Sequence, residues 1–315
     1  MPQPQRILIP LPLALRTANA WLYPGRGGDP SALVDSGIGT TEGYDALRQG
    51  LWDSGVDANG LALFITHGHV DHAGNAARLR REFGALLHAP REESPYVETF
   101  RRDSERRYAA YTKALKSHGV PVEEIAKMQQ RGQEMDPWHE DVPIQAPLVD
   151  GQRLQLGATS ATAHITPGHT PGSTVFATED NDLLTGDTLL EHITSNAIEV
   201  TDRDKGRYAQ YLRTLDGLRR FVGMRALPGH HDPFQVTDAL LDNHLAKHEA
   251  RSRRILDHLD GPRTAWQLVP EVFPRLVHDQ SFLGVCEVVG HLHALEEQGR
   301  VLMRESGGKR TFLRA

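Results

Sequence analysis

Cysteine is almost absent from this sequence, which contains a single one, Cys286, among 315 residues. One cysteine cannot form a disulfide within the chain, so the fold does not depend on an oxidising compartment. Long hydrophobic runs are also missing, although hydrophobic residues make up 39% of the chain. A membrane-spanning helix needs about 20 consecutive apolar residues, so the sequence predicts a globular protein without a membrane partner, and we expect it in the cytoplasm.

A surplus of positive charge is lacking as well, because the formal net charge is −6 at pH 7. Such a chain has no general attraction to nucleic acid or to anionic membranes. Nucleic acid is therefore an unexpected partner, although a local basic groove would escape a sum over the whole chain.

The apolar segment Ile7–Leu15, with the small residues that follow it, superficially resembles a secretory signal peptide. Pro10 and Pro12 interrupt the segment, and residues 21–23 continue a strand pattern. We therefore interpret the segment as the first two strands and not as a signal peptide.

Histidine, in contrast, is plentiful, and three of the 17 histidines fall in the hexapeptide HGHVDH, one residue after the apolar run LALFI. His67 and His69 are two residues apart, so on an extended backbone their imidazoles point the same way and can share one cation. Asp71 and His72 begin a stretch with helical periodicity, for which Asp71 is the predicted N-cap. These two side chains are therefore predicted to face a second cation beside the first.

Three later segments supply further candidate ligands after strand-like runs. His169 lies in the Gly- and Pro-rich segment TPGHTPGS, and Asp187 ends the apolar run in LLTGDTLL, where its carboxylate could bridge two cations or merely cap a turn. The segment ALPGHHDP offers His230, which repeats the Pro-Gly-His pattern, and His231, which we interpret as supporting a ligand or facing the substrate. Asp35, in ALVDSG, either orients a ligand imidazole or only forms a turn.

Taken together, this pattern resembles the metallo-β-lactamase superfamily, whose motif His-x-His-x-Asp-His precedes a lone His, an Asp and a final His. The resemblance covers about residues 5 to 240 and implies an α+β fold, an αββα sandwich with the metals at one edge of the sheets. It implies that His67, His69 and His169 hold one metal. It also implies that a second metal is held by Asp71, His72 and His230, with Asp187 lying between the two.

The resemblance makes a dinuclear metal-dependent hydrolase the expected function. A water bridging two divalent cations has a pKa near 7, so a metal-bridging hydroxide could attack without a side-chain nucleophile. Asp71 could then carry the proton to the leaving group as a catalytic residue. Zinc is the expected metal, and manganese or iron would also suit histidine and carboxylate ligands.

Residues 1–243 are predicted to form the catalytic domain, with a charged helical insertion at about residues 91–142. Apolar residues recur in the insertion at roughly helical intervals: Tyr96, Phe100, Tyr108, Tyr111, Leu115, Ile125, Met128 and Trp138. They could form a lid whose aromatic rings line an acyl pocket. Alternatively, they could form a helical hairpin that packs on the core or on a partner subunit.

The tail, residues 244–315, is predicted to form helices over 244–259, from Thr264 to Val272 and from Ser281, and then a hairpin around Gly307. This composition is similar to the winged-helix domain of the β-lactamase-like-2 branch of the superfamily. The would-be recognition helix carries three glutamates and no Lys or Arg before residue 300. An acidic helix suits a phosphate backbone badly, so we expect a structural role or a homodimer interface.

The substrate is the least determined property, because one metal centre can serve many chemistries. A carboxylic ester, thioester or lactone is expected, because the insertion contributes aromatic residues and the chain is acidic. The alternatives are a phosphodiesterase or endoribonuclease, a mononuclear iron enzyme of the sulfur-dioxygenase type, and a non-catalytic binding protein.

Overall fold

The computed structural model describes residues 3–56, 60–276 and 280–315, and the chain divides into two compact units. The first unit comprises Met1–Arg102, Met135–Ser195 and Leu218–Asp238, and the second comprises Asp103–Glu134, Asn196–Gly217 and Ala239–Ala315. The second unit thus takes part of the insertion as well as the tail. The domain boundary expected after residue 243 stays a prediction.

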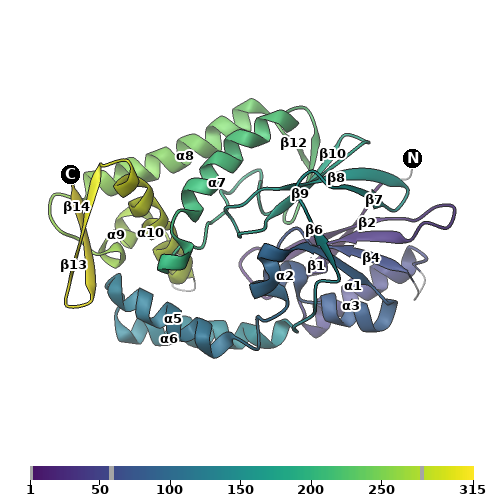
Figure 1. The fold of residues 1–315 in the computed structure, drawn as a ribbon, viewed down its shortest axis with the longest axis horizontal. Helices are drawn as coiled ribbons and strands as arrows, with labels where there is room; N and C mark the ends of the chain where they lie inside the picture. Colours follow the sequence, from purple (N-terminus) through teal and green to yellow (C-terminus); the bar gives the residue numbers. More distant parts are fainter. Residues whose placement is uncertain (1–2, 57–59, 277–279) are drawn as a thin grey trace. The chain divides into compact units, whose positions relative to one another are not determined.

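The first unit contains two mixed six-stranded sheets, many of whose strands are labelled in Figure 1. One sheet runs β1-β2-β3-β4-β5-β6, formed by β1 (Gln5–Pro10), β2 (Thr17–Tyr23), β3 (Ser31–Val34), β4 (Leu61–Phe64), β5 (Leu86–Pro90) and β6 (Ala146–Leu148). The other runs β12-β11-β10-β9-β8-β7, formed by β7 (Arg153–Leu156), β8 (Thr159–Ile165), β9 (Thr174–Thr178), β10 (Asp182–Gly186), β11 (Arg225–Pro228) and β12 (Phe234–Gln235). The prediction that the N-terminal segment forms the first two strands is confirmed, because β1 and β2 pair in antiparallel fashion.

A buried core joins the two sheets face to face. Its larger side chains come from both sheets: Trp21, Val34, Phe64, Leu156, Phe176 and Leu184. The other face of the first sheet packs against α1 (Thr41–Asp53) and α3 (Ala76–Phe83), where Ile9 meets Leu47 and Leu79 in a second cluster. This is the αββα sandwich with flanking helices that the sequence predicted.

The helix after β4 departs from the prediction that Asp71 is its N-cap. The short helix α2 (Val70–Ala73) begins two residues earlier than predicted, with His69 at the N-cap position, and α3 starts separately at Ala76. Asn75 lies in the break, where its side-chain amide donates to the carbonyls of Ser36 and Ile38 at 2.9 and 2.7 Å. These long-range hydrogen bonds, which no local periodicity reveals, hold the break between the two helices.

The second unit is mainly helical. Its elements are α5 (Ser104–Ser117), α6 (Val122–Met135, whose last residue belongs to the first unit), α7 (Arg207–Gly217), α8 (Asp238–Asp257), α9 (Ala265–Val272), α10 (Ser281–Glu297), β13 (Val301–Ser306) and β14 (Lys309–Arg314). The predicted helix start at Thr264 is confirmed, because Thr264 and Gln267 form a capping box. Among the residues that the structure describes, the remaining short helices are α4 (Ser94–Val97) and the 3₁₀ helices Arg91–Glu93, Asp136–Trp138, Asp202–Asp204 and Leu218–Phe221.

Part of the predicted insertion packs into the core of the second unit. Leu115 and Ile125 share one buried cluster with Leu256 of α8 and Val289 of α10. This packing agrees with the hairpin interpretation of the insertion. The lid interpretation stays a prediction.

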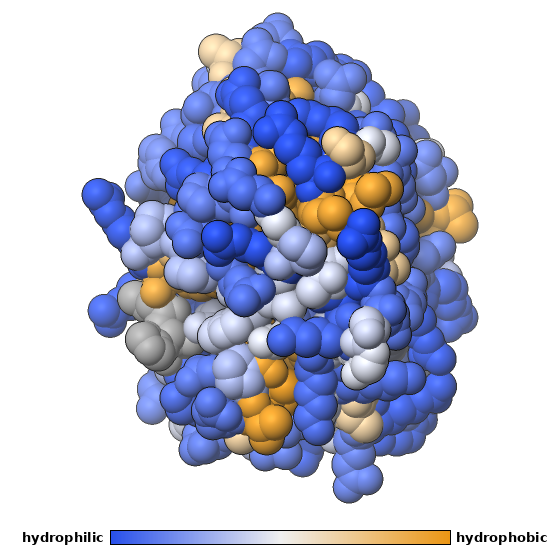
Figure 2. Space-filling model, turned by 90° about the vertical axis from the view of Figure 1, so that its left-hand side faces the viewer, coloured by the Kyte–Doolittle hydropathy of each residue, from blue (hydrophilic) through white to orange (hydrophobic). Residues whose placement is uncertain are grey.

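Large hydrophobic side chains are exposed at scattered described positions such as Trp52, Val122 and Leu302. On the face shown in Figure 2, hydrophobic residues form small separate patches among hydrophilic ones. Among the described residues, no helix combines the length and the apolar character that crossing a bilayer requires.

Candidate metal centre

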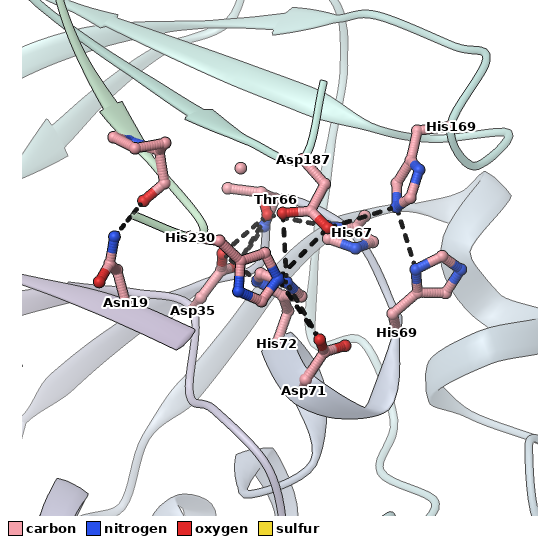
Figure 3. A network of polar contacts seen from close by, with 12 residues as sticks. Asn19, Asp35, Thr66, His67, His69, Asp71, His72, His169, Asp187 and His230 are labelled. Atoms are coloured by element: carbon pink, nitrogen blue, oxygen red, sulfur yellow. Dashed lines mark hydrogen bonds and ion pairs between the residues drawn. The ribbon is translucent and has the colours of Figure 1, made fainter. Parts of the chain in front are cut away.

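The candidate ligands follow the ends of four strands of the first unit. His67 and His69 come after β4, His169 after β8, Asp187 directly after β10, and His230 after β11. Although they span more than half of the chain, their side chains converge on one place, as Figure 3 shows. The sandwich topology therefore brings together the residues that the sequence singled out.

Three imidazoles form the first set. Ligand atoms of His67, His69 and His169 all lie within 4.8 Å of one another. The Nε2 atom of His169 is 3.0 Å from Nδ1 of His69, and the ring of His67 is 4.6 Å from that of His169. Three imidazoles that meet in this way are a common zinc-binding arrangement.

The second set combines a carboxylate with two imidazoles. Asp71, His72 and His230 also place their ligand atoms within 4.8 Å of one another. The Nε2 atom of His230 lies 3.3 Å from Nε2 of His72 and 3.5 Å from Oδ2 of Asp71. Both sets are candidate metal-binding clusters typical of a dinuclear centre of this kind.

Asp187 lies between the two sets. Its Oδ2 atom is 3.8 Å from Nε2 of His169 in the first set and 3.5 Å from Nε2 of His230 in the second. Its Oδ1 atom is 3.5 Å from Nε2 of His72. One carboxylate therefore reaches both sets, although its role as a metal ligand stays a prediction.

The side chains present fit a bound cation. The Nε2 atoms of His67 and His69 are buried and have no hydrogen-bond partner, which is unusual for buried polar atoms unless an ion or a water satisfies them. Gly229 also leaves room at the centre, since a Cβ atom there would lie 2.6 Å from both Oδ1 of Asp187 and Cε1 of His72.

Asp35 orients one of the candidate ligands, as the first of its two interpretations proposed. Its Oδ2 atom lies 2.9 Å from Nδ1 of His72, and its Oδ1 atom accepts the Thr66 backbone N–H at 2.8 Å. The backbone of Asp35 has a φ of 63°, a left-handed conformation that costs energy in a residue other than glycine. Holding the His72 ring with Nε2 toward the centre gives this strained turn a function.

Glu93 is a supporting residue that the sequence did not reveal. Its fully buried carboxylate accepts the Gly68 N–H at 2.6 Å on one oxygen. On the other oxygen it accepts the Thr170 hydroxyl and the Gly172 N–H, both at 2.7 Å. Glu93 therefore ties the loop of His67 and His69 to the loop of His169.

Two more contacts orient ligands from a distance. The Ser195 hydroxyl lies 2.8 Å from Nδ1 of His169, and Nδ1 of His230 lies 2.7 Å from the carbonyl oxygen of Thr17. Each contact leaves the Nε2 atom of its histidine directed to the centre. The sequence could not reveal these contacts, because the partners are far apart along the chain and neither a serine nor a backbone carbonyl belongs to a recognisable motif.

The charges of the two sets differ. Burial, together with neighbouring imidazoles, lowers the pKa of His67 well below its usual value and lowers the pKa of His69 to about 3. Burial would also lower the pKa of His230, but the Asp187 carboxylate outweighs it and raises that pKa to about 10. The first set is therefore ready to bind a cation, whereas the second must release a proton.

His231 and Tyr96 border the centre. His231 is partly buried, has a φ of 64°, and uses its carbonyl oxygen to accept a hydrogen bond from Asn19 at 2.8 Å. Whether its ring faces a substrate stays a prediction. The ring of Tyr96, on α4, stands edge-on to that of His69 with 6.0 Å between centroids, so one aromatic residue of the predicted insertion borders the centre.

Comparisons with known proteins agree with this geometry. The model of the metallo-beta-lactamase superfamily matches residues 14–230. The chain is 27% identical over 301 residues to the "Probable metallo-hydrolase YqjP" of Bacillus subtilis, and the match covers 93% of this chain and 92% of that protein. It is 26% identical over 298 residues to the "Atrochrysone carboxyl ACP thioesterase" of Emericella nidulans, covering 90% of this chain and 77% of that protein.

Among solved structures, the metallo-beta-lactamase family protein TTHA1429 from Thermus thermophilus resembles the chain with a TM-score of 0.85. The two are 29% identical, and the alignment covers 100% of this chain and 99% of that one. The likeness therefore extends over both compact units.

Proposed function

The chain belongs to the metallo-beta-lactamase superfamily, and on this premise we infer that it is a metallo-hydrolase and propose that it cleaves a carboxylic thioester, ester or lactone. The observation that carries the proposal is the position of Asp187 between two sets of candidate ligands. A single carboxylate shared by two sets of ligands suits two divalent cations better than one.

The first set and the second set would each hold one cation, and we propose zinc, with manganese and iron as alternatives. Two such ions would supply hydroxide at neutral pH and polarise the substrate carbonyl oxygen. Asp71 is only partly exposed. Its partial burial would raise the pKa of its carboxyl, but the neighbouring His72 outweighs this effect and lowers that pKa. As an ionised carboxylate beside the centre, Asp71 can accept a proton and deliver it to the leaving group.

Three observations support an acyl substrate. A relative that covers most of this chain is named as a thioesterase. Tyr96 offers an aromatic ring beside His69, where an apolar acyl group could pack. The net charge of −6 gives no general attraction to RNA or to phosphodiesters of nucleic acids.

The test is a substrate panel with zinc-loaded protein, containing acyl thioesters, p-nitrophenyl esters, lactones, bis-p-nitrophenyl phosphate and single-stranded RNA. We expect turnover of an acyl compound that His69→Ala abolishes and that His164→Ala, a histidine on β8 outside the centre, leaves intact. RNA cleavage with a steep salt dependence would replace the proposal by an endoribonuclease. One iron per chain with oxygen consumption would replace it by a dioxygenase.

We also propose that residues 244–315 form a winged-helix-like domain. The support is the order of elements, in which α9 and α10 precede the antiparallel hairpin of β13 and β14. Helix α10 carries glutamates and no Lys or Arg, so we assign this domain a structural or dimer-forming role and not DNA binding.

A further inference from the structure

A second group of metal-binding residue types lies in the second compact unit, separate from the centre described above. His248 is on α8, and Glu287 and His291 are on α10. One ligand atom from each lies within 4.8 Å of the others. The three residues are 2%, 6% and 0% exposed, respectively, so they form an interior cluster and not a surface patch.

The spacing on α10 suits a shared ligand. Glu287 and His291 are four residues apart, so they lie on the same face of the helix, and Nε2 of His291 is 3.8 Å from Oε1 of Glu287. His248 approaches from α8, with its ring 5.9 Å from that of His291. Two imidazoles and a carboxylate that meet across a helix pair are a donor set that zinc and other first-row divalent metals accept.

The hydrogen bonds of the cluster are incomplete in a way that points to an ion. Neither ring nitrogen of His248 has a hydrogen-bond partner, and the same is true of Nε2 of His291. The Ser252 hydroxyl lies 2.7 Å from Nδ1 of His291, which fixes that ring and leaves Nε2 as its available atom. Buried imidazole nitrogens are normally paired, and metal ligands are typically oriented through their second nitrogen in this way.

The surroundings keep the donors in the form that binds a metal. Burial lowers the pKa of both His248 and His291, so both rings are neutral at pH 7. The ring of Tyr208 packs against both imidazoles, at 5.5 and 4.3 Å between centroids. Arg251 donates to Oε1 of Glu287 at 2.6 Å and thereby holds this carboxylate in place.

We propose that His248, Glu287 and His291 bind a divalent transition-metal ion, with zinc as the natural occupant. The ion would link α8 to α10 inside the second unit. It would act as a structural crosslink, because its ligands are buried and none belongs to the candidate metal centre. The site would therefore be independent of the hydrolase reaction.

The test uses the full chain carrying His69→Ala, Asp187→Ala and His230→Ala, which remove at least one candidate ligand from each set of the metal centre and the carboxylate between the sets. This parent protein is stripped of metal, incubated with zinc and dialysed against a weak chelator, and its zinc is then counted by elemental analysis. We expect about one zinc per chain, as for a structural site with apparent affinity far above that of the chelator, and a higher melting temperature with zinc. A parent that retains no zinc overturns the proposal, whatever any further variant does.

Variants in the parent assign the ion to the cluster. His248→Gln and His291→Gln should each lose the retained zinc and its thermal shift. His118→Gln removes another fully buried histidine of the same unit and should retain both. Circular dichroism shows which variants fold, and a folded His248→Gln or His291→Gln protein that binds zinc like the parent refutes the assignment.

Discussion

Replacing Glu93 by Gln tests whether a carboxylate far from the motifs holds the metal centre together. In the native protein, one oxygen of Glu93 accepts the Gly68 N–H and the other accepts the Thr170 hydroxyl and the Gly172 N–H. A glutamine has one oxygen and one NH₂ group in the same space. Its best orientation keeps the oxygen on the two donors of the His169 loop, which leaves NH₂ facing the Gly68 N–H.

The magnitude follows from that geometry. At the native separation of 2.6 Å, two donors would replace one charge-assisted hydrogen bond, whose loss in a buried site costs about 2–3 kcal/mol. Gly68 lies between His67 and His69, so the repulsion also displaces the two imidazoles. Loss of a residue that orients metal ligands weakens metal binding about 10–100-fold, and we expect Glu93→Gln to show both effects.

Urea unfolding measures the free energy of unfolding, and competition with a chromophoric chelator measures zinc affinity. The matched control is Glu98→Gln, because Glu98 also accepts a backbone N–H from a distant residue, that of Ile144 at 2.9 Å, yet contacts no ligand loop. Glu98→Gln should retain zinc affinity. If Glu93→Gln matches the wild type in both measurements, the assignment of Glu93 to the two loops is wrong.

Three further predictions concern the centre itself. Asp187→Ala removes the carboxylate shared by both sets, so the zinc content measured by elemental analysis should fall. The hydrolysis rate should decrease at least 100-fold, which corresponds to about 3 kcal/mol of lost transition-state stabilisation. Undiminished activity would contradict a shared carboxylate. The Asp187 carboxylate raises the pKa of His230 to about 10 in the metal-free protein, so zinc must displace a proton and zinc affinity should rise with pH from about 6.5 toward 10. The ion pair between His230 and Asp187 should stabilise the metal-free protein fully below about pH 6.5, and this stabilisation should be lost as the pH rises toward 10. Titrations at several pH values measure both trends, and a flat zinc affinity would refute the first. Gly229→Ala places a methyl group 2.6 Å from Asp187 and should abolish zinc binding, while Gly261→Ala, where no atom lies within 4 Å, should leave it unchanged.

The insertion shows where periodicity stops being informative. Helical spacing predicted helices in the insertion, with a lid and a packed hairpin as the two interpretations, and the structure contains α5 and α6 there. The partners of these helices could not be predicted, because Leu115 packs with Leu256 and Val289, which lie far along the chain. Deleting the hairpin would therefore expose the core of the second unit, so a lid is better tested by single substitutions of exposed residues.

The centre divides in the same way between local and distant information. The sequence alone determined which side chains are candidate ligands. His67 and His69 are spaced so that both imidazoles can bind one cation, and the apolar residues before them indicate the strand that positions them. The capped helix at Thr264 and the C-terminal hairpin were determined locally too.

Only the tertiary structure decided which residues orient those ligands. Glu93 reaches Thr170 across 77 positions and Ser195 reaches His169 across 26, and a carboxylate or hydroxyl that acts at such a distance leaves no spacing to detect. The same holds for His248, which meets Glu287 and His291 only because α8 packs beside α10. A ligand motif depends on the geometry of neighbouring residues, whereas the hydrogen bonds that complete a buried site depend on which distant segments pack together in the folded chain.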